Sequence, residues 1–508
     1  MRNLLRDAAA GVLAAGLGIA VAELFAAVTR PDAAPLIAVG GAIIDATPTP
    51  VKEFAVRELG TNDKPVLLAS VGLVLALFAA TLGVVGRRRR NLVVVGAVVL
   101  GAAGATAALT RPTASWFSPV PSLLAAAIAG ATLWWLLRTA VGPANDRTDV
   151  AAANDRTAIV PTSNRRAFLR GALLVAGAAV LFESGAQLLI RTVGKVRTTL
   201  ALPAPAEPAK PLPAGIAPDF TTPSATFYRV DTALTIPRVD PDTWELRIHG
   251  MVGTELKLSL DDLLKRPLIE RDITLNCVSN EVGGPYIGTA RWLGVPLAPL
   301  LREAGLRPEA DQIVARSVEG MTIGTPVATA LDGRDTMLAV AMNGEPLRPE
   351  HGFPVRMLTP GLYGYAGACK WVTELELTTF AAFDAYWVKR GWARPGTVKT
   401  ASRIDKPRPF ARPAAGPVTV AGVAWAQRRG IDKVEISVDG GPWKAAEMLP
   451  VPSIDTWVQW RLTWNATPGP HSLSVRATDG TGQVQTADRA TPFPSGATGQ
   501  HTITVTVG

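Results

Sequence analysis

Histidine and cysteine are scarce in this chain of 508 residues, which contains four of the first and two of the second. Two cysteines, Cys277 and Cys369, are too few for a multi-disulfide framework or a four-cysteine zinc site. They allow one disulfide, or one metal-bound thiolate beside an uninvolved thiol. The sequence also lacks a Cys-x-x-Cys-His motif, and no histidine lies in an apolar run of membrane-spanning length. The apolar runs therefore offer no pair of axial ligands for a haem.

Charged residues make up only 18% of the chain, and the net charge of +9 comes largely from arginines that flank apolar runs near the N-terminus. These arginines form no basic face beside aromatic residues, as nucleic-acid binding would require. We interpret the charge as membrane orientation and expect no nucleic-acid partner. The hydrophobic content of 48% also favours a membrane protein, and the length corresponds to roughly two to four domains.

Five apolar runs are long enough to cross a bilayer as helices. They lie at residues 8–29, 65–85, 91–110, 119–137 and 168–190. A further apolar stretch, 34–46, is shorter and is bounded by proline and aspartate, so we expect an interfacial or re-entrant segment there. The sequence thus predicts a five-helix membrane bundle, with four transmembrane helices in residues 1–140 and the fifth at 168–190.

The placement of arginines predicts the orientation of these helices. If the N-terminus is cytoplasmic, the cytoplasmic side receives Arg2, Arg6, Arg87–Arg90, Arg138, Arg147, Arg156, Arg165, Arg166 and Arg170. The outer loops receive only Arg30, Lys52, Arg57, Lys64 and Arg111. The positive-inside rule then predicts a multi-pass protein of the cell membrane, with everything after about residue 191 outside the cytoplasm.

The predicted cytoplasmic loop at 141–167 ends in a motif that resembles a twin-arginine export signal. Residues 162–171 read TSNRRAFLRG, in which the adjacent Arg165 and Arg166 precede an apolar run. The arginine pair alone also agrees with ordinary cytoplasmic charge at the start of the last helix. Both interpretations place the segment on the cytoplasmic side.

The rest of the chain reads as a linker followed by globular domains. Residues 191–217 are rich in proline and alanine and predict a semi-rigid spacer. From 218 to 400, short strand-like and helical segments alternate, which is typical of an α+β domain. ELRIHG at 245–250 and DITLNCV at 272–278 read as strands. SLDDLLKR, which starts at Ser259, reads as a helix with a serine N-cap.

From 401 to 508 the pattern changes to alternating strands separated by Gly, Pro and Asp turns. About seven strands in roughly 100 residues predict an all-β, immunoglobulin-like sandwich. We expect the clustered Trp457, Trp460 and Trp464 to fill the core or an interface rather than to form a ligand platform.

Cys277 ends an apolar strand and opens the glycine-rich loop CVSNEVGGPYIG. A thiolate at a strand end suits a soft or high-valent metal, and Gly283 and Gly284 permit the close approach of a large ligand. From residue chemistry alone, a buried structural cysteine or a disulfide with Cys369 is the plainer interpretation.

Three ordered blocks around and after Cys277 change that balance. They are TLNCVSNEVGG, ARWLGVPLAPLL at 290–301, and MNGEPLRPEHGFPVRMLTPGLYGYAGACKWVTELEL at 342–377. Their content, order and spacing resemble the molybdopterin-dependent oxidoreductases of the sulfite oxidase family. The β-rich C-terminus is similar to that family's immunoglobulin-like dimerisation domain. The resemblance implies a molybdopterin-binding domain at 218–400 and a homodimer formed through 401–508.

The resemblance also implies roles for individual residues. Cys277 matches the cysteine whose sulfur ligates molybdenum, and Asn280 matches an asparagine three residues later. His351 and Arg356 match positions that hold the pterin and its phosphate, and Lys370 matches a lysine that contacts the pterin. Arginine suits a phosphate because its planar guanidinium donates two charge-assisted hydrogen bonds.

The sequence departs from the family pattern where the substrate would bind. Val230, Asp231 and Thr232 stand in place of the family's Arg-Asn-His run, and Glu281 and Val282 replace arginines after the cysteine. An acidic side chain near the metal would repel a dianion such as sulfite. The resemblance therefore predicts the cofactor more firmly than the substrate.

Together these features predict a membrane-anchored molybdenum-cofactor oxidoreductase that carries out two-electron oxygen-atom transfer outside the cytoplasm. Sulfite or another small oxo compound would be the substrate. Tyr363 would be the catalytic tyrosine, with Tyr365 as the nearest alternative. The electrons would pass to a separate cytochrome or quinone-linked subunit.

The alternative is a non-enzymatic adhesion protein with an immunoglobulin-like tip and a Cys277–Cys369 disulfide. The enzyme hypothesis also gives the export motif a reason. Molybdopterin is inserted in the cytoplasm, so a domain that encloses it must fold before it crosses the membrane, and the twin-arginine route exports folded proteins.

Overall fold

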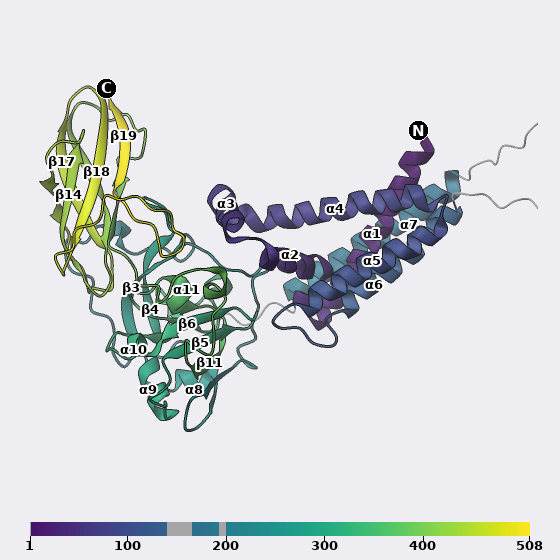
Figure 1. Cartoon of the computed structure of the whole chain (residues 1–508), viewed down its shortest axis with the longest axis horizontal. Coiled ribbons are helices and arrows are strands. Elements are labelled where there is room, and N and C mark those ends of the chain that lie inside the picture. Colours follow the sequence, from purple (N-terminus) through teal and green to yellow (C-terminus); the bar gives the residue numbers. More distant parts are fainter. Residues whose placement is uncertain (1, 140–164, 193–199) are drawn as a thin grey trace, which may run out of the picture. The chain divides into compact units, whose positions relative to one another are not determined.

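The computed structural model describes residues 2–139, 165–192 and 200–508 (Figure 1). The predicted loop at 141–167 and linker at 191–217 therefore lie partly outside the described residues. The described chain separates into two compact units. The first contains the helices up to residue 192 together with Ala233–Thr235, and the second contains the rest from residue 200 onward.

The first unit is helical. Its helices are α1 (Arg2–Thr29), α2 (Pro35–Ala46), α3 (Thr49–Leu59), α4 (Asp63–Gly86), α5 (Arg90–Leu109), α6 (Val120–Thr139) and α7 (Arg165–Thr192). Within the described residues, five of them (α1, α4, α5, α6 and α7) are long and apolar enough to cross a membrane. They coincide with the five apolar runs of the sequence, whereas α2 has only 12 residues and is too short to span.

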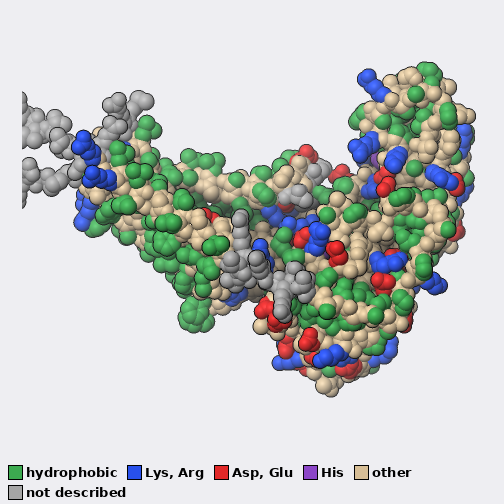
Figure 2. Space-filling view, turned by 180° about the vertical axis from the view of Figure 1, so that it is seen from behind, with side chains coloured by type: hydrophobic (Ala, Val, Ile, Leu, Met, Phe, Trp, Pro, Cys, Tyr) green, Lys and Arg blue, Asp and Glu red, His purple; other side chains and the backbone are tan. Residues whose placement is uncertain are grey.

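Small residues let these helices pack closely, while large apolar side chains face outward. A Cβ atom on Gly11 of α1 would overlap the carbonyl oxygen of Ala79 in α4, so only glycine permits this contact. Leu73, Val74 and Leu77 of α4 are each more than half exposed. Figure 2 shows such hydrophobic side chains over the visible face of the helices. An apolar outer surface of this kind suits a lipid environment.

Basic side chains gather at one end of the helical unit (Figure 2). Arg87, just after α4, forms an ion pair with Asp7 of α1 at 3.1 Å. The guanidinium of Arg6 lies 5.6 Å from the ring centroid of Phe168 in α7. The beginnings of α1 and α7 and the end of α4 therefore lie together, which is the arrangement that the predicted orientation requires.

The second unit begins with a mixed sheet, in which β1 and β11 are parallel, and an antiparallel sheet. Among the described residues from 200 onward, the first sheet has the order β2 (Leu256–Ser259), β1 (Glu245–Gly250), β11 (Val372–Thr378), β5 (Gln312–Ser317) and β6 (Thr322–Pro326). The second has the order β10 (Ala368–Cys369), β9 (Arg356–Leu358), β7 (Met337–Met342), β4 (Ile287–Pro296) and β3 (Ile269–Asn276), with β8 (Glu345–Pro346) beside β7. Short helices connect the strands: α8 (Leu260–Leu264), α9 (Leu297–Glu303), α10 (Val327–Ala330) and α11 (Gly364–Gly367).

Local sequence signals in this region are confirmed. The strand β1 has the predicted bounds, and β3 ends at Asn276, so Cys277 directly follows a strand. Helix α8 begins after Ser259, whose hydroxyl accepts a hydrogen bond from the Asp262 amide while the Asp262 carboxylate accepts from the Ser259 amide. This reciprocal capping box satisfies two backbone donors that the helix leaves unpaired.

The C-terminal segment contains two antiparallel sheets. In the described residues after 400, one has the order β12 (Ala401–Lys406), β13 (Gly416–Trp425), β17 (Val458–Ala466) and β16 (Glu447–Met448). The other has the order β15 (Lys444–Ala445), β14 (Ile431–Val438), β18 (Gly469–Asp479) and β19 (His501–Val507). Both sheets contribute to one hydrophobic core, which includes the fully buried Trp460. Trp464 packs against the same core, so the expected structural role of these tryptophans is confirmed.

The strand that leads to Cys277 is tied to the C-terminal sheets. Thr274 of β3 accepts a hydrogen bond from the backbone of Trp457 at 2.7 Å through its hydroxyl. Its amide donates to the carbonyl of Asp455 at 2.9 Å, and its carbonyl accepts from the Gln427 side chain at 3.1 Å. These bonds fix the end of β3 from outside its own sheet, and they therefore help to position Cys277.

Candidate active site

Cys277 stands at the start of a tight loop that returns to β4. Its amide donates to the carbonyl of Tyr286 at 2.9 Å. Asn280 braces this loop with two hydrogen bonds. Its side-chain oxygen accepts from the backbone N–H of Tyr286 at 2.8 Å, and its backbone N–H donates to the Cys277 carbonyl at 3.1 Å. Gly283 has a φ of +79°, in the left-handed region that favours glycine. The glycine-rich sequence therefore holds the cysteine at a defined point beyond the strand.

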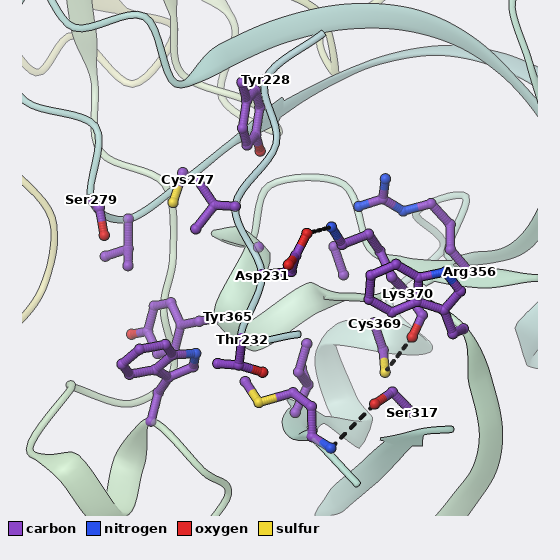
Figure 3. A pocket seen from close by; sticks show the side chains of 18 of the residues that line it. Tyr228, Asp231, Thr232, Cys277, Ser279, Ser317, Arg356, Tyr365, Cys369 and Lys370 are labelled. Carbon is purple, nitrogen blue, oxygen red and sulfur yellow. Dashed lines mark hydrogen bonds and ion pairs between the residues drawn. The ribbon is translucent and has the colours of Figure 1, made fainter. Parts of the chain in front are cut away.

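The Cys277 side chain faces a cavity of about 120 Å³ (Figure 3). Five sequence segments line it: the stretch at 227–232, the cysteine loop, the strand ends near 317–323, the region from His351 to Trp371, and the segment that carries Trp387 and Trp392. Four of the six predicted site residues meet here, namely Cys277, His351, Arg356 and Lys370. Residues that are far apart in sequence thus form one site, as the ordered blocks predict.

Arg356 and His351 form a buried corner of the cavity. The guanidinium of Arg356 lies 5.1 Å from the ring centroid of Trp292, and one of its nitrogens donates to the His351 carbonyl at 3.3 Å. Burial lowers the pKa of Arg356 to about 10 and also lowers the pKa of His351. His351 Nε2 donates to the carbonyl of Ser224 at 2.7 Å. At neutral pH, Arg356 therefore carries the positive charge of this corner.

Lys370 enters the cavity already paired. Its ammonium group lies 2.6 Å from the carboxylate of Asp231, which is almost fully buried, and 3.3 Å from the carbonyl of Glu350. Arg229 forms a second ion pair with Asp231 at 2.9 Å. The stretch from Val230 to Thr232, which the sequence aligns with the family's Arg-Asn-His run, thus does line the cavity, but it contributes an acid instead of a free cation.

The two cysteines are separate thiols. Cys277 and Cys369 are both buried and free, so the disulfide of the adhesion hypothesis is not formed. Burial raises the pKa of Cys277, while hydrogen bonds from Ser279 and the charge of Lys370 act in the opposite direction. Burial also raises the pKa of Cys369, to about 12. Cys369 lies in β10 and its sulfur approaches the Lys370 carbonyl at 3.7 Å.

The structure does not bring the other predicted residues to the cavity wall. Asn280 and Tyr363 line a smaller neighbouring pocket, as does Glu281. Burial raises the pKa of Tyr363 to about 12, and the Cys277 charge adds to this effect, so Tyr363 is near the cysteine without facing the same space. Its hydroxyl accepts from the Lys399 amide at 3.3 Å. Glu281, whose side chain is exposed, therefore does not supply an acidic group to the cavity beside Cys277.

Other side chains complete the wall, and of these the sequence analysis named only Tyr365. Tyr228, Tyr365, Trp387 and Trp392 line the cavity, together with the acidic Glu319. Helix α11 begins after Tyr363, so the side chains of Tyr363 and Tyr365 fall on different sides of the chain. The two tryptophans come from a short irregular segment that carries no recognisable motif. Only the spacing of aromatic residues in AYWVKRGW gives a signal.

Comparisons with known proteins agree with this geometry. The family model for the oxidoreductase molybdopterin binding domain matches residues 233–387. Mitochondrial sulfite oxidase of Rattus norvegicus is 31% identical over 283 residues, which cover 47% of this chain and 51% of the relative. The uncharacterized oxidoreductase YuiH of Bacillus subtilis is 32% identical over 157 residues, which cover 31% of this chain and 76% of the relative.

A solved structure, that of the sulfane dehydrogenase SoxCD from Paracoccus pantotrophus, is 26% identical and covers 52% of this chain and 74% of its own, with a TM-score of 0.47. The chain spans about half the length of the curated sulfite oxidases that it matches. The similarity is concentrated on the segment that builds the cavity around Cys277. The chain therefore belongs to the molybdopterin-binding oxidoreductases of the sulfite oxidase family, whose cofactor is the molybdenum cofactor.

Proposed function

We propose that this protein is a membrane-anchored oxidoreductase that transfers an oxygen atom in a two-electron reaction, with its cofactor in the cavity beside Cys277. The observation that carries the proposal is the meeting of a free buried thiol and a buried arginine in one cavity. When bound, the cofactor supplies the two-electron redox chemistry. The chain supplies a sulfur ligand, holds the organic part of the cofactor and shapes the access of the substrate.

The residues of the cavity fit the cofactor's two chemically distinct ends. Within the part of the chain that the structure describes, Arg356 Nε is buried and has no hydrogen-bond acceptor. An unpaired buried donor on a cation is costly, and a phosphate would satisfy it with charge-assisted bonds. We assign the phosphate to Arg356, with His351 and Lys370 beside it. We assign the metal to the Cys277 sulfur, because a thiolate is the soft ligand that such a site needs.

Two assignments change in the light of the cavity wall. Asn280 acts on the cofactor indirectly, by holding the loop that carries Cys277. Tyr228 and Tyr365 line the cavity, so they are better placed than Tyr363 to contact a substrate. We propose Tyr365 for this role, since its hydroxyl is held by the Ala393 carbonyl and its ring is fixed in the wall.

The orientation in the membrane is also a proposal. The arginines at one end of the helical unit support a cytoplasmic N-terminus, five spans and an enzyme domain outside the cytoplasm. A domain that must fold around its cofactor first would be exported through the motif at Arg165 and Arg166. We further propose that 401–508 is an immunoglobulin-like dimerisation domain, and that electrons leave to a separate cytochrome or quinone-linked subunit.

The test is the metal and its ligands in purified full-length protein. We expect about one molybdenum per chain in the wild type, and X-ray absorption should count one sulfur ligand fewer in Cys277→Ser. Cys369→Ser is the matched control, because Cys369 is also buried in the same cavity wall but is given no role as a ligand. A wild type without molybdenum from cofactor-replete cells, or an unchanged sulfur count in Cys277→Ser, would refute the proposal.

A further inference from the structure

The cavity has two chemically different sides. Arg356 and Lys370 lie on one side, and Figure 3 shows Tyr365 on the opposite side, across from Arg356. Around Tyr365 the wall is built from rings: its centroid lies 5.8 Å from that of Trp392, which in turn lies 6.2 Å from that of Trp387 at an interplanar angle of 81°. If Arg356 receives the phosphate, the aromatic side is left for the substrate.

Aliphatic side chains extend this aromatic wall. Val278, directly after the cysteine, lines the cavity together with Met321 and Ile323. Trp387 is only half-buried, so its ring is accessible from the cavity and from solvent. Apolar and aromatic walls with a few polar groups are the usual lining of sites for small organic molecules. An inorganic oxyanion would gain little from such a wall.

The charges in the cavity disfavour a dianion. Lys370 already pairs with Asp231, and Arg356 belongs to the buried corner assigned to the phosphate, which itself brings a charge of about −1.5 to −2. Glu319 adds a further acid to the wall and accepts a hydrogen bond from the Thr232 hydroxyl at 3.3 Å. Among the described lining residues, no cation remains uncommitted for a doubly negative substrate. Repulsion in a partly dehydrated site would therefore oppose its binding.

We propose that the substrate is a neutral organic heteroatom oxide with an apolar, preferably aromatic, group, or the deoxygenated partner of such an oxide. This inference rests on the proposed oxygen-atom transfer. For a sulfoxide, the sulfur–oxygen bond breaks and the sulfur is reduced: R₂SO, two electrons and two protons give R₂S and water. A reduced viologen dye supplies the electrons in the assay, and in the reverse direction water supplies the oxygen atom and an oxidised dye takes up the electrons.

The experiment compares neutral and anionic ligands on the metallated full-length protein. The probes are methyl phenyl sulfoxide, dimethyl sulfoxide and sulfite for turnover, and methyl phenyl sulfoxide and sulfate for binding by calorimetry. We expect kcat/KM for the aryl sulfoxide to exceed that for dimethyl sulfoxide by about tenfold, because contact with aromatic rings favours the aryl group. We also expect calorimetry to detect the aryl sulfoxide but not sulfate.

Variants of the wall test whether the rings select the substrate. Trp387→Ala should remove most of the aryl preference, mainly through KM, whereas Trp387→Phe should retain most of it. Trp443→Ala is the control, since Trp443 is also half-buried but lies at the C-terminal sheets, with its ring 4.3 Å from the Arg476 guanidinium. Sulfite turnover above that of both sulfoxides, or an aryl preference that survives Trp387→Ala, would overturn the inference. In that case a normal molybdenum content and Cys277 ligation would leave the proposed function intact.

Discussion

Asp479 is a residue at which we expect a single change of charge to cause a large loss of stability. Its side chain, at the end of β18, is fully buried and accepts hydrogen bonds from Arg429 Nε at 2.9 Å, Thr400 Oγ1 at 2.7 Å and Thr481 Oγ1 at 2.6 Å. Asp479→Asn keeps the shape but turns one acceptor into a donor that faces other donors. Breaking one partner of a buried ion pair costs about 3–5 kcal/mol. Arg429 is partly exposed, so we expect the lower end, about 3 kcal/mol.

Thermal unfolding of the detergent-solubilised full chain, followed by tryptophan fluorescence, measures this loss. The C-terminal sheets belong to a larger compact unit, in which 1 kcal/mol shifts Tm by about 2–4 °C, so Asp479→Asn should lower Tm by about 6–12 °C. Asp439→Asn is the control, because the Asp439 side chain is 49% exposed and its ion pair with His471 lies at the surface. Such pairs contribute about 0–1 kcal/mol. Equal Tm values for the two variants would refute the reasoning.

The Asp479 carboxylate also determines how the stability of the folded state changes with pH. Burial alone would raise the pKa of Asp479, but hydrogen bonds from Thr481, Thr400 and Arg429 outweigh it and hold the pKa well below its usual value. A group with a lowered pKa stabilises the folded state above its unfolded pKa of about 3.9, and this contribution is lost as the pH falls through the folded pKa. The Tm difference between the wild type and Asp479→Asn should therefore be constant from about pH 5 to 8 and shrink only below about pH 4.

Two further predictions concern the cofactor and the export of the enzyme domain. Arg356→Met should weaken retention of the pterin by about tenfold or more, because charge-assisted hydrogen bonds are each worth about 1.5–3 kcal/mol. The fluorescence of released pterin per chain measures this retention. Arg348→Met is the control and should leave the retention unchanged, because Arg348 is exposed. Replacing Arg165 and Arg166 together by lysine should keep the charge but prevent export of the metallated domain, as measured by protease accessibility in spheroplasts, whereas Arg170→Lys should not. An exported, metallated domain in the double variant would contradict the twin-arginine hypothesis.

Much of the local structure could be predicted because its causes are local. The strand at Glu245–Gly250 follows from alternating apolar residues, and Ser259 caps a helix through a contact only three residues away. Cys277 could be placed at a strand end for the same reason. The meeting of Cys277, His351 and Arg356 in one cavity is different, because composition and periodicity do not predict it. That these residues meet was predicted from the resemblance of the three ordered sequence blocks to one family.

The details of the wall could not be predicted because they depend on turns and on packing. Whether Tyr363 or Tyr365 faces the cavity is decided by the single turn of α11 that begins between them. Glu281 follows Cys277 closely in sequence, yet the Asn280 brace closes the loop and leaves Glu281 exposed. Asp231, which the sequence placed correctly, is neutralised by Lys370 through a contact across 139 positions. Such pairings are set by the tertiary fold and not by a short sequence pattern.

The cofactor domain and the β-domain, which we divide at residue 400, share one hydrophobic cluster. Val278, the neighbour of Cys277, packs in one cluster with Phe220 and Tyr363 and with Trp425 and Trp457 of the C-terminal sheets. The indole of Trp457 donates to the Phe220 carbonyl at 3.1 Å, so the cluster is joined by a directed bond as well as by apolar contact. Removal of 401–508 would therefore expose the back of the cysteine loop.

The β3 strand has the same dependence. Without the C-terminal sheets, Thr274 would lose Asp455 as the partner of its amide and Gln427 as a partner of its carbonyl. Its hydroxyl would lose Trp457 and keep only Thr289. Because Cys277 lies three residues further along the chain, directly after β3, freedom at Thr274 would make the position of the Cys277 sulfur less well defined. The metal-ligand role that we propose for Cys277 requires its sulfur to be held within about 0.5 Å. The C-terminal sheets thus act as positioning elements of the active site, whatever their role in dimerisation.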